Sequence, residues 1–176
     1  MVAVLRFVGV FLLCWFASAA QSQISGKAEQ RSATQDLEPL LRSLFEAIGT
    51  LSDYRTPETL PAVFQLPQAV LEAKVCDEPC NVSAAYIPHD GIYLAEYLDP
   101  EQQPVDRSIL LHELVHYLQQ GHPKFAHLNG CERERAKEQE AYEIQNAYLA
   151  TLATGRRAVF YDGEFDCSGT ESTHTP

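Results

Sequence analysis

Residues 108–119, "SILLHELVHYLQ", place His112 and His116 four positions apart, with Glu113 directly after the first histidine. On an α-helix, residues four apart lie on one face, so both imidazole rings can reach one point in space. The rest of the stretch is mostly apolar, and histidine and glutamate are costly to bury in such surroundings without polar partners. A metal ion satisfies imidazole nitrogens, so the stretch predicts a metal-binding helix.

The pattern His-Glu-x-x-His also gives Glu113 a role of its own. Glu113 borders the site without having to bind the metal, so its carboxylate can accept a proton from a metal-bound water. Zinc is the expected ion, because it takes neutral histidine nitrogens at ~2.0–2.1 Å. We therefore expect His112 and His116 as zinc ligands and Glu113 as the general base of a hydrolysis reaction.

A catalytic zinc site needs a third protein ligand, and one candidate follows the first helix. His122 lies six positions after His116, which is the spacing of the third histidine in metzincins. Metzincins have a glycine where this chain has Gln119, and they also need a downstream methionine turn. The only methionine here is Met1, so this arrangement is the less favoured one.

The favoured third ligand lies further along the chain. Residues 138–142, "EQEAY", resemble the E-x-x-A-D segment of gluzincin-type peptidases, with Tyr142 in place of the aspartate. The resemblance implies that Glu138 is the ligand. Helical spacing places Glu138 and Ala141 on one face, and the small alanine would let two helices approach closely. Glu140 is the alternative, although it points away from that face at 3.6 residues per turn.

Together these motifs resemble the zincin superfamily in its gluzincin-like branch, over roughly residues 82–155. The chain is also similar to small uncharacterised exported bacterial proteins that carry an HELVH-x-LQ helix followed by an E-x-x-AY helix. The resemblance implies a zinc metallopeptidase that acts on a peptide or protein substrate. The alternative is a non-catalytic zinc-binding exported protein with a structural or partner-binding role.

The elements that must position these residues can be read from the sequence pattern. A helix is expected from Asp106 or Ser108 to Gly121, and a second from Cys131 to Gly155. The segments "SAAYI" and "GIYLA", joined by the turn residues "PHDG", predict two strands, and we expect "GIYLA" to offer an edge to an extended substrate. Residues 36–49 and "QAVLEAKVC" have helical character. The fold class is α+β, a helix-dominated minimal zincin-like domain with a small β-sheet beside the HExxH helix.

The N-terminus predicts export. Arg6, an apolar run over residues 7–16 and the small residues of "ASA" at 17–19 are typical of a signal peptide. The polar residues 20–35 are expected to form a flexible linker, which leaves residues 36–176 as a single domain. The apolar run is short for a membrane span, so no stable span is expected after signal cleavage, and the protein is expected to be secreted or periplasmic.

Four cysteines remain after cleavage, since Cys14 lies in the signal peptide. An even number in an oxidising compartment predicts disulfides, and four cysteines allow three pairings. The pairs Cys76–Cys80 and Cys131–Cys167 are favoured. The first pair closes the short loop "CDEPC", and the second ties the C-terminal tail to the start of the late helix.

The chain is strongly acidic, with a formal net charge of −11. Removal of residues 1–19 takes away only Arg6 and leaves −12. Such a surface repels nucleic acid and anionic lipid, so neither is expected as a partner.

Overall fold

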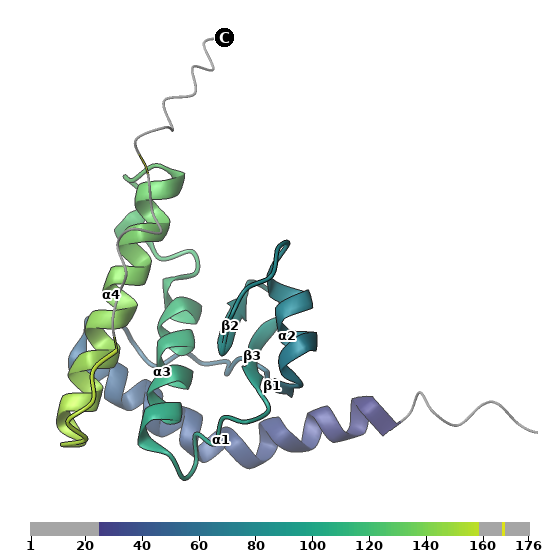
Figure 1. Ribbon diagram of the computed structural model, residues 1–176. Coiled ribbons are helices and arrows are strands. Elements are labelled where there is room, and N and C mark those ends of the chain that lie inside the picture. Colours follow the sequence, from purple (N-terminus) through teal and green to yellow (C-terminus); the bar gives the residue numbers. More distant parts are fainter. Residues whose placement is uncertain (1–24, 159–166, 168–176) are drawn as a thin grey trace, which may run out of the picture.

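The computed structural model describes residues 25–158 and Cys167, and the predicted signal peptide lies outside them. Helices dominate this part of the chain and a small sheet accompanies them, which confirms the helix-dominated α+β class (Figure 1). The elements are α1 (Ser25–Leu51), β1 (Val63–Leu66), α2 (Gln68–Val75), β2 (Ala84–Ile87), β3 (Gly91–Ala95), α3 (Pro104–Gln119), the 3₁₀ turn η1 (Pro123–Phe125) and α4 (Gly130–Thr151).

The sheet has the strand order β1-β3-β2, so β3 lies in its centre. β3 pairs with β1 in parallel and with β2 antiparallel, and all five of its residues are buried. The prediction that "GIYLA" offers an edge to a substrate is therefore wrong, because that segment is β3. The edge beside α3 belongs to β2. The sequence missed β1 because this strand has only four residues, between Pro61 and Pro67.

Helix α1 begins earlier than the sequence analysis expects. It runs from Ser25, so the linker predicted for residues 20–35 is helical over its second half. Residues 25–35 contain no proline and several good helix formers, including alanine, glutamine and lysine. In Figure 1 this long helix crosses below α3 and α4 and continues past the sheet.

Helix α3 lies at the centre of the fold, in contact with α1, α4 and the sheet. Its apolar side chains Leu110, Leu111, Leu114 and Val115 are fully buried. They join a core that α1 supplies with Leu41, Leu44, Phe45 and Ile48. Burial on several sides explains why "SILLHELVHYLQ" is so apolar, and it fixes the position of the two histidines that the helix carries.

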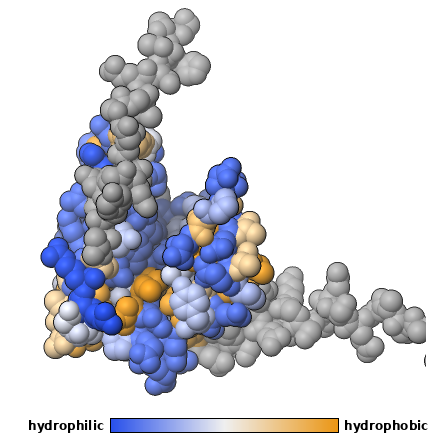
Figure 2. Space-filling view, in the orientation of Figure 1, coloured by the Kyte–Doolittle hydropathy of each residue, from blue (hydrophilic) through white to orange (hydrophobic). Residues whose placement is uncertain are grey.

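The surface and the cross-links also agree with the sequence. The face in Figure 2 is mostly hydrophilic, with smaller apolar areas. No helix among the described residues is long and apolar enough to span a membrane. The disulfides Cys76–Cys80 and Cys131–Cys167 are both present, which confirms the predicted pairing.

Gly91 permits the close approach of β1 and β3. Its φ is +150°, and a Cβ there would lie 2.8 Å from the Ala62 carbonyl oxygen. We expect Gly91→Ala to destabilise the fold by about 1–3 kcal/mol, because the added carbon must displace backbone and the conformation is strained. Urea unfolding measures the difference. Gly130→Ala is the matched control, since nothing lies within 4 Å of its Cβ position; an equal loss in both variants would contradict this explanation.

Candidate metal centre

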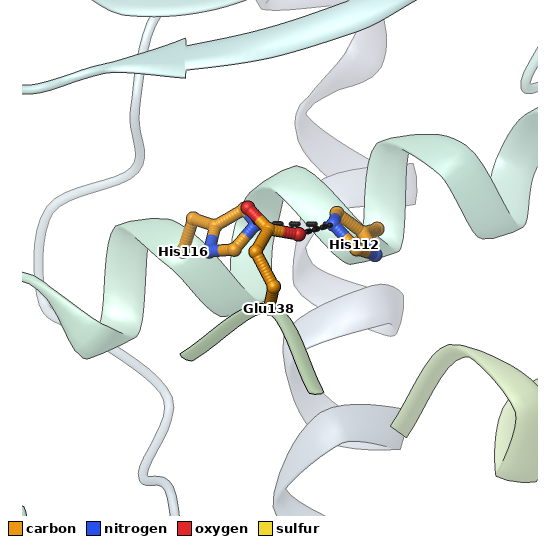
Figure 3. A group of neighbouring side chains, drawn as sticks. All are labelled: His112, His116 and Glu138. Atoms are coloured by element: carbon orange, nitrogen blue, oxygen red, sulfur yellow. Dashed lines mark hydrogen bonds and ion pairs between the residues drawn. The ribbon is translucent and has the colours of Figure 1, made fainter. Parts of the chain in front are cut away.

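Helices α3 and α4 bring together the three ligands that the sequence analysis favoured. The Glu138 carboxylate lies between the two histidines, with one oxygen facing each ring (Figure 3). Its Oε2 is 3.3 Å from His112 Nε2, and its Oε1 is 3.1 Å from His116 Nε2. The two Nε2 atoms are 3.0 Å apart. Among the described residues, these three side chains form the one group that could hold a metal ion.

These separations suit a small tetrahedral metal ion. Ligand atoms at ~2.0–2.1 Å from a tetrahedral centre lie about 3.3 Å from one another, and the three observed distances are 3.0, 3.1 and 3.3 Å. Two imidazole nitrogens and a carboxylate also form a ligand set typical of zinc enzymes, which keep a fourth position for water or substrate. The residues present therefore fit a metal ion.

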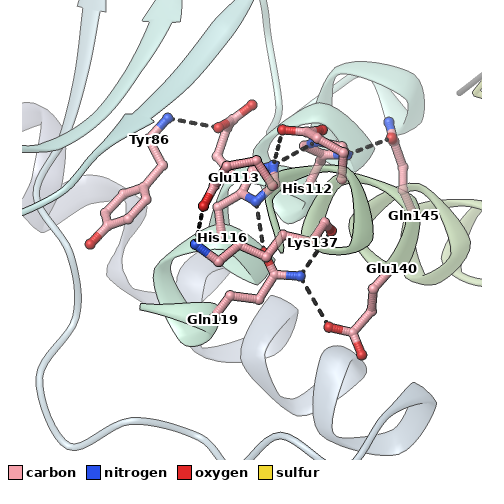
Figure 4. Close-up of polar contacts among 10 residues, drawn as sticks. Tyr86, His112, Glu113, His116, Gln119, Lys137, Glu140 and Gln145 are labelled. Atoms are coloured by element: carbon pink, nitrogen blue, oxygen red, sulfur yellow. Dashed lines mark hydrogen bonds and ion pairs between the residues drawn. The ribbon is translucent and has the colours of Figure 1, made fainter. Parts of the chain in front are cut away.

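The tautomer of His112 is fixed by a chain of buried hydrogen bonds. The Val105 carbonyl can only accept, so it takes the hydroxyl proton of Ser108 at 2.7 Å. Ser108 Oγ then accepts from Gln145 Nε2 at 3.1 Å. This turns Gln145 Oε1 towards His112 Nδ1, 3.2 Å away (Figure 4). His112 must donate from Nδ1, so in the neutral ring its Nε2 carries a bare lone pair.

A second chain fixes His116 in the same way. The Lys137 carbonyl accepts from Gln119 Nε2 at 3.0 Å, and a carboxylate oxygen of Glu140 accepts from the same nitrogen at 3.0 Å. Gln119 Oε1 therefore faces His116 Nδ1 at 2.9 Å. His116 donates from Nδ1, so in the neutral ring its Nε2 also presents a lone pair to the site.

The result is a site in which only acceptor atoms meet. Two bare Nε2 atoms and two carboxylate oxygens converge, and neither amide chain supplies a hydrogen between them. Such an arrangement is repulsive unless a positive charge, a proton or a metal ion, lies at its centre. Orientation of ligating histidines through Nδ1 is common in metal proteins.

The pKa values show the same preference for positive charge. Burial alone lowers the pKa of His116, but the hydrogen bond to Glu138 and the negative charges of Glu113 and Glu138 outweigh it and raise the pKa to about 9. Burial raises the pKa of Glu138, whereas the hydrogen bonds from His112 and His116 lower it well below its usual range. The cluster thus keeps a carboxylate and attracts a cation.

Glu113 is also buried, and it points to the sheet and not into the ligand group. Its Oε2 accepts the backbone N–H of Tyr86 in the edge strand β2, at 2.7 Å (Figure 4). The general base expected from the sequence thus lies beside the site, between α3 and β2.

The other candidate ligands are engaged elsewhere. The His122 ring packs against Tyr54, with centroids 5.1 Å apart, and its Nδ1 accepts from the Lys124 backbone. Glu140 binds Tyr54, Lys124 and Gln119, and burial, which raises its pKa, is outweighed by these donors, which lower it. Neither residue belongs to the metal-ligating group.

Sequence reasoning missed Gln119 and Gln145 as positioning residues. Both are almost fully buried, and each accepts from one histidine. Tyr142, which stands where the gluzincin pattern has an aspartate, packs its ring edge-on against His112 at 4.6 Å between centroids. Gln145 supplies the acceptor for His112 Nδ1. The available signal was periodicity, because Gln119 follows His116 by three positions and Gln145 follows Glu138 by two turns.

The comparisons with known proteins place the chain in a family. A family model described as "Domain of unknown function (DUF6647)" matches residues 33–159, which is most of the chain, so the chain belongs to that family. No curated protein and no solved structure matches it.

We expect the purified protein to hold about one divalent metal ion per chain. Glu138→Ala removes one of the three ligands and should abolish stable binding, whereas His122→Ala should leave it intact because His122 packs on Tyr54. Elemental analysis after dialysis against buffer measures both. Metal loss only in His122→Ala would contradict the assignment and favour the metzincin arrangement.

We also expect Gln145→Leu to weaken metal binding about 10–100-fold, because His112 loses the acceptor that fixes its tautomer. Competition with a chelator of known affinity measures the change. Gln139→Leu, at an exposed position on the same helix, is the matched control. Equal affinities of the two variants would show that the amide does not position the ligand.

Proposed function

We propose that this protein is a zinc-dependent hydrolase of the gluzincin-like zincin type, and specifically an exported metallopeptidase. The observation that carries the proposal is the convergence of His112, His116 and Glu138 as acceptors, with Glu113 anchored beside them. Zinc is the proposed ion because two imidazoles and one carboxylate suit it. His112, His116 and Glu138 would hold it.

The proposed mechanism divides the work between the ion and the chain. A zinc ion bound there supplies Lewis acidity, which activates water and polarises a carbonyl group. Glu113 removes a proton from the attacking water and later delivers it to the leaving amine. Its hydrogen bond to Tyr86 holds one carboxylate oxygen and leaves Oε1 to take the proton. Gln119 and Gln145 keep both imidazoles in the ligating tautomer throughout.

The sheet supports a peptide as the substrate class. β2 is an edge strand, and Glu113 occupies the outward N–H of Tyr86, so a substrate would pair with the rest of this edge. An extended peptide has the regular main-chain donors and acceptors that pair with such an edge. The edge that the sequence analysis assigned to "GIYLA" is thus replaced by β2, in a position next to the general base.

The ligand group and its neighbour Glu113 support a catalytic zinc site over a purely structural one, and the disulfides support export. A structural site fills all four positions with protein, whereas the group among the described residues has three members. A structural site also has no use for a general base beside it. The two disulfides fit an oxidising compartment such as the periplasm or the exterior, as the signal-like N-terminus predicts.

We expect Glu113→Gln to reduce peptide hydrolysis by about 10²–10⁴-fold, because the amide cannot take the proton from water. The variant keeps all three ligands and should bind zinc as the wild type does. Turnover is measured with zinc-loaded protein, residues 20–176, on a mixed-sequence fluorogenic peptide library. Elemental analysis measures the bound zinc.

Glu134→Gln is the control, since Glu134 is exposed, lies on α4 and pairs with Lys137. Hydrolysis that survives in Glu113→Gln would remove the proposed role of Glu113. Full zinc binding without hydrolysis of the library by the wild type would favour the non-catalytic zinc-binding protein.

A further inference from the structure

Glu140 is a charged residue one shell beyond the metal site. Its Oε2 accepts from Tyr54 at 2.6 Å and from Gln119 at 3.0 Å, and its Oε1 accepts from Lys124. The carboxylate is half-buried and surrounded by donors. In its ionised form it has only acceptor atoms. It draws together the loop after α1, η1, α3 and α4 at a single point.

The contact with Gln119 has a consequence for the ligand next to it. An amide can rotate by half a turn and exchange its oxygen and nitrogen with little change of shape. In Gln119 the nitrogen faces two acceptors, the Lys137 carbonyl and Glu140. The carboxylate gives the stronger of these bonds, because hydrogen bonds to an ionised group are roughly twice as strong as neutral ones.

Reversal of the Gln119 amide would disable the neighbouring ligand. The amide nitrogen would then face His116 Nδ1, which would have to become an acceptor, and the ring proton would move to Nε2. A protonated Nε2 cannot bind a metal. The orientation of Gln119 therefore decides whether His116 presents its lone pair to the site.

The hydrogen-bond chains behind the two histidines end in different kinds of group. The chain behind His112 is neutral and ends in the α3 backbone, through Gln145 and Ser108. The chain behind His116 ends in a charge that Tyr54 and Lys124 also hold. Only His116 is thus linked to an ionised group outside the ligand set through its amide partner.

We propose that Glu140 is a positioning residue of the metal centre, which fixes the Gln119 amide and through it the metal-binding tautomer of His116. The sequence pattern left Glu140 as an alternative ligand, but this role needs no direct contact with the metal. The inference rests on the proposed function only in that His116 binds the metal, and it is independent of turnover.

The test is a double-mutant cycle on zinc affinity, with Glu140→Gln, Gln119→Leu and the double variant of residues 20–176. Chelator competition should show about a tenfold weaker affinity for Glu140→Gln, at the low end of the 10–100-fold typical of outer partners. In the Gln119→Leu background the same change should cost less than about twofold, because the amide through which Glu140 acts is gone. Glu143→Gln removes the same charge from an exposed site on α4 and should leave the affinity unchanged.

A second readout needs no metal. Imidazole ¹⁵N shifts of the zinc-free protein, followed with rising pH until the His116 shifts no longer change, report which nitrogen of the neutral ring carries the proton. The wild type should show His116 protonated at Nδ1, and Glu140→Gln should show a mixture with Nε2. Circular dichroism identifies variants that do not fold. Tyr54→Phe is the control, because it keeps the Glu140 carboxylate beside Gln119, and the ¹⁵N shifts of the folded variant should match those of the wild type.

Equal affinity losses from Glu140→Gln in both backgrounds would overturn the proposal, since they would mean that the charge acts on the metal directly or through the fold. An unchanged His116 tautomer in folded Glu140→Gln would overturn it as well. Neither readout involves hydrolysis, so an inactive wild type would reject the proposed peptidase and leave this inference to be decided on its own data.

Discussion

Four acceptor atoms meet at the contact between α3 and α4, and the rest of the site is built to keep them there. The Gln119 amide is oriented by the Lys137 carbonyl and Glu140, and the Gln145 amide by the Ser108 hydroxyl. Both histidines therefore carry a proton on Nδ1. The lone pairs and the Glu138 carboxylate therefore repel one another unless a cation joins them. Burial of α3 in the core prevents the helices from moving apart to relieve that repulsion.

The sequence predicted the parts of the site that depend on local geometry. His112 and His116 follow from a spacing of four, which is a property of any α-helix. Glu138 required more, because five glutamates lie between Glu132 and Glu143, and the choice depends on which face of α4 meets α3. The family resemblance and the small Ala141 supplied that choice. The disulfide pairing was only a preference, because the sequence alone cannot choose among three pairings, and the structure contains the two favoured pairs.

Other parts could not be read from the sequence, for definite physical reasons. Gln119 and Gln145 look like ordinary polar helix residues, and their role arises only where tertiary packing places a carbonyl or hydroxyl behind each amide. β1 is too short to show an alternating pattern, and without it β3 looks like an edge. The early start of α1 depends on helix propensity over a polar stretch, which composition alone also assigns to a linker.

The distribution of the site along the chain ties its assembly to the whole fold. The candidate metal ligands lie on α3 and α4, and the loop that their contact closes is about as long as the loop closed by the pairing of β1 with β3. Glu113 takes its place only when β2 is present, and the sheet requires Val63 of β1 to find Ile92 of β3. Both sets of contacts are therefore non-local, and both raise the contact order of the fold. Loss of the sheet would leave the three candidate ligands on their two helices and would release Glu113, so the proposed metal depends on the helix pair and the proposed chemistry depends on the sheet as well.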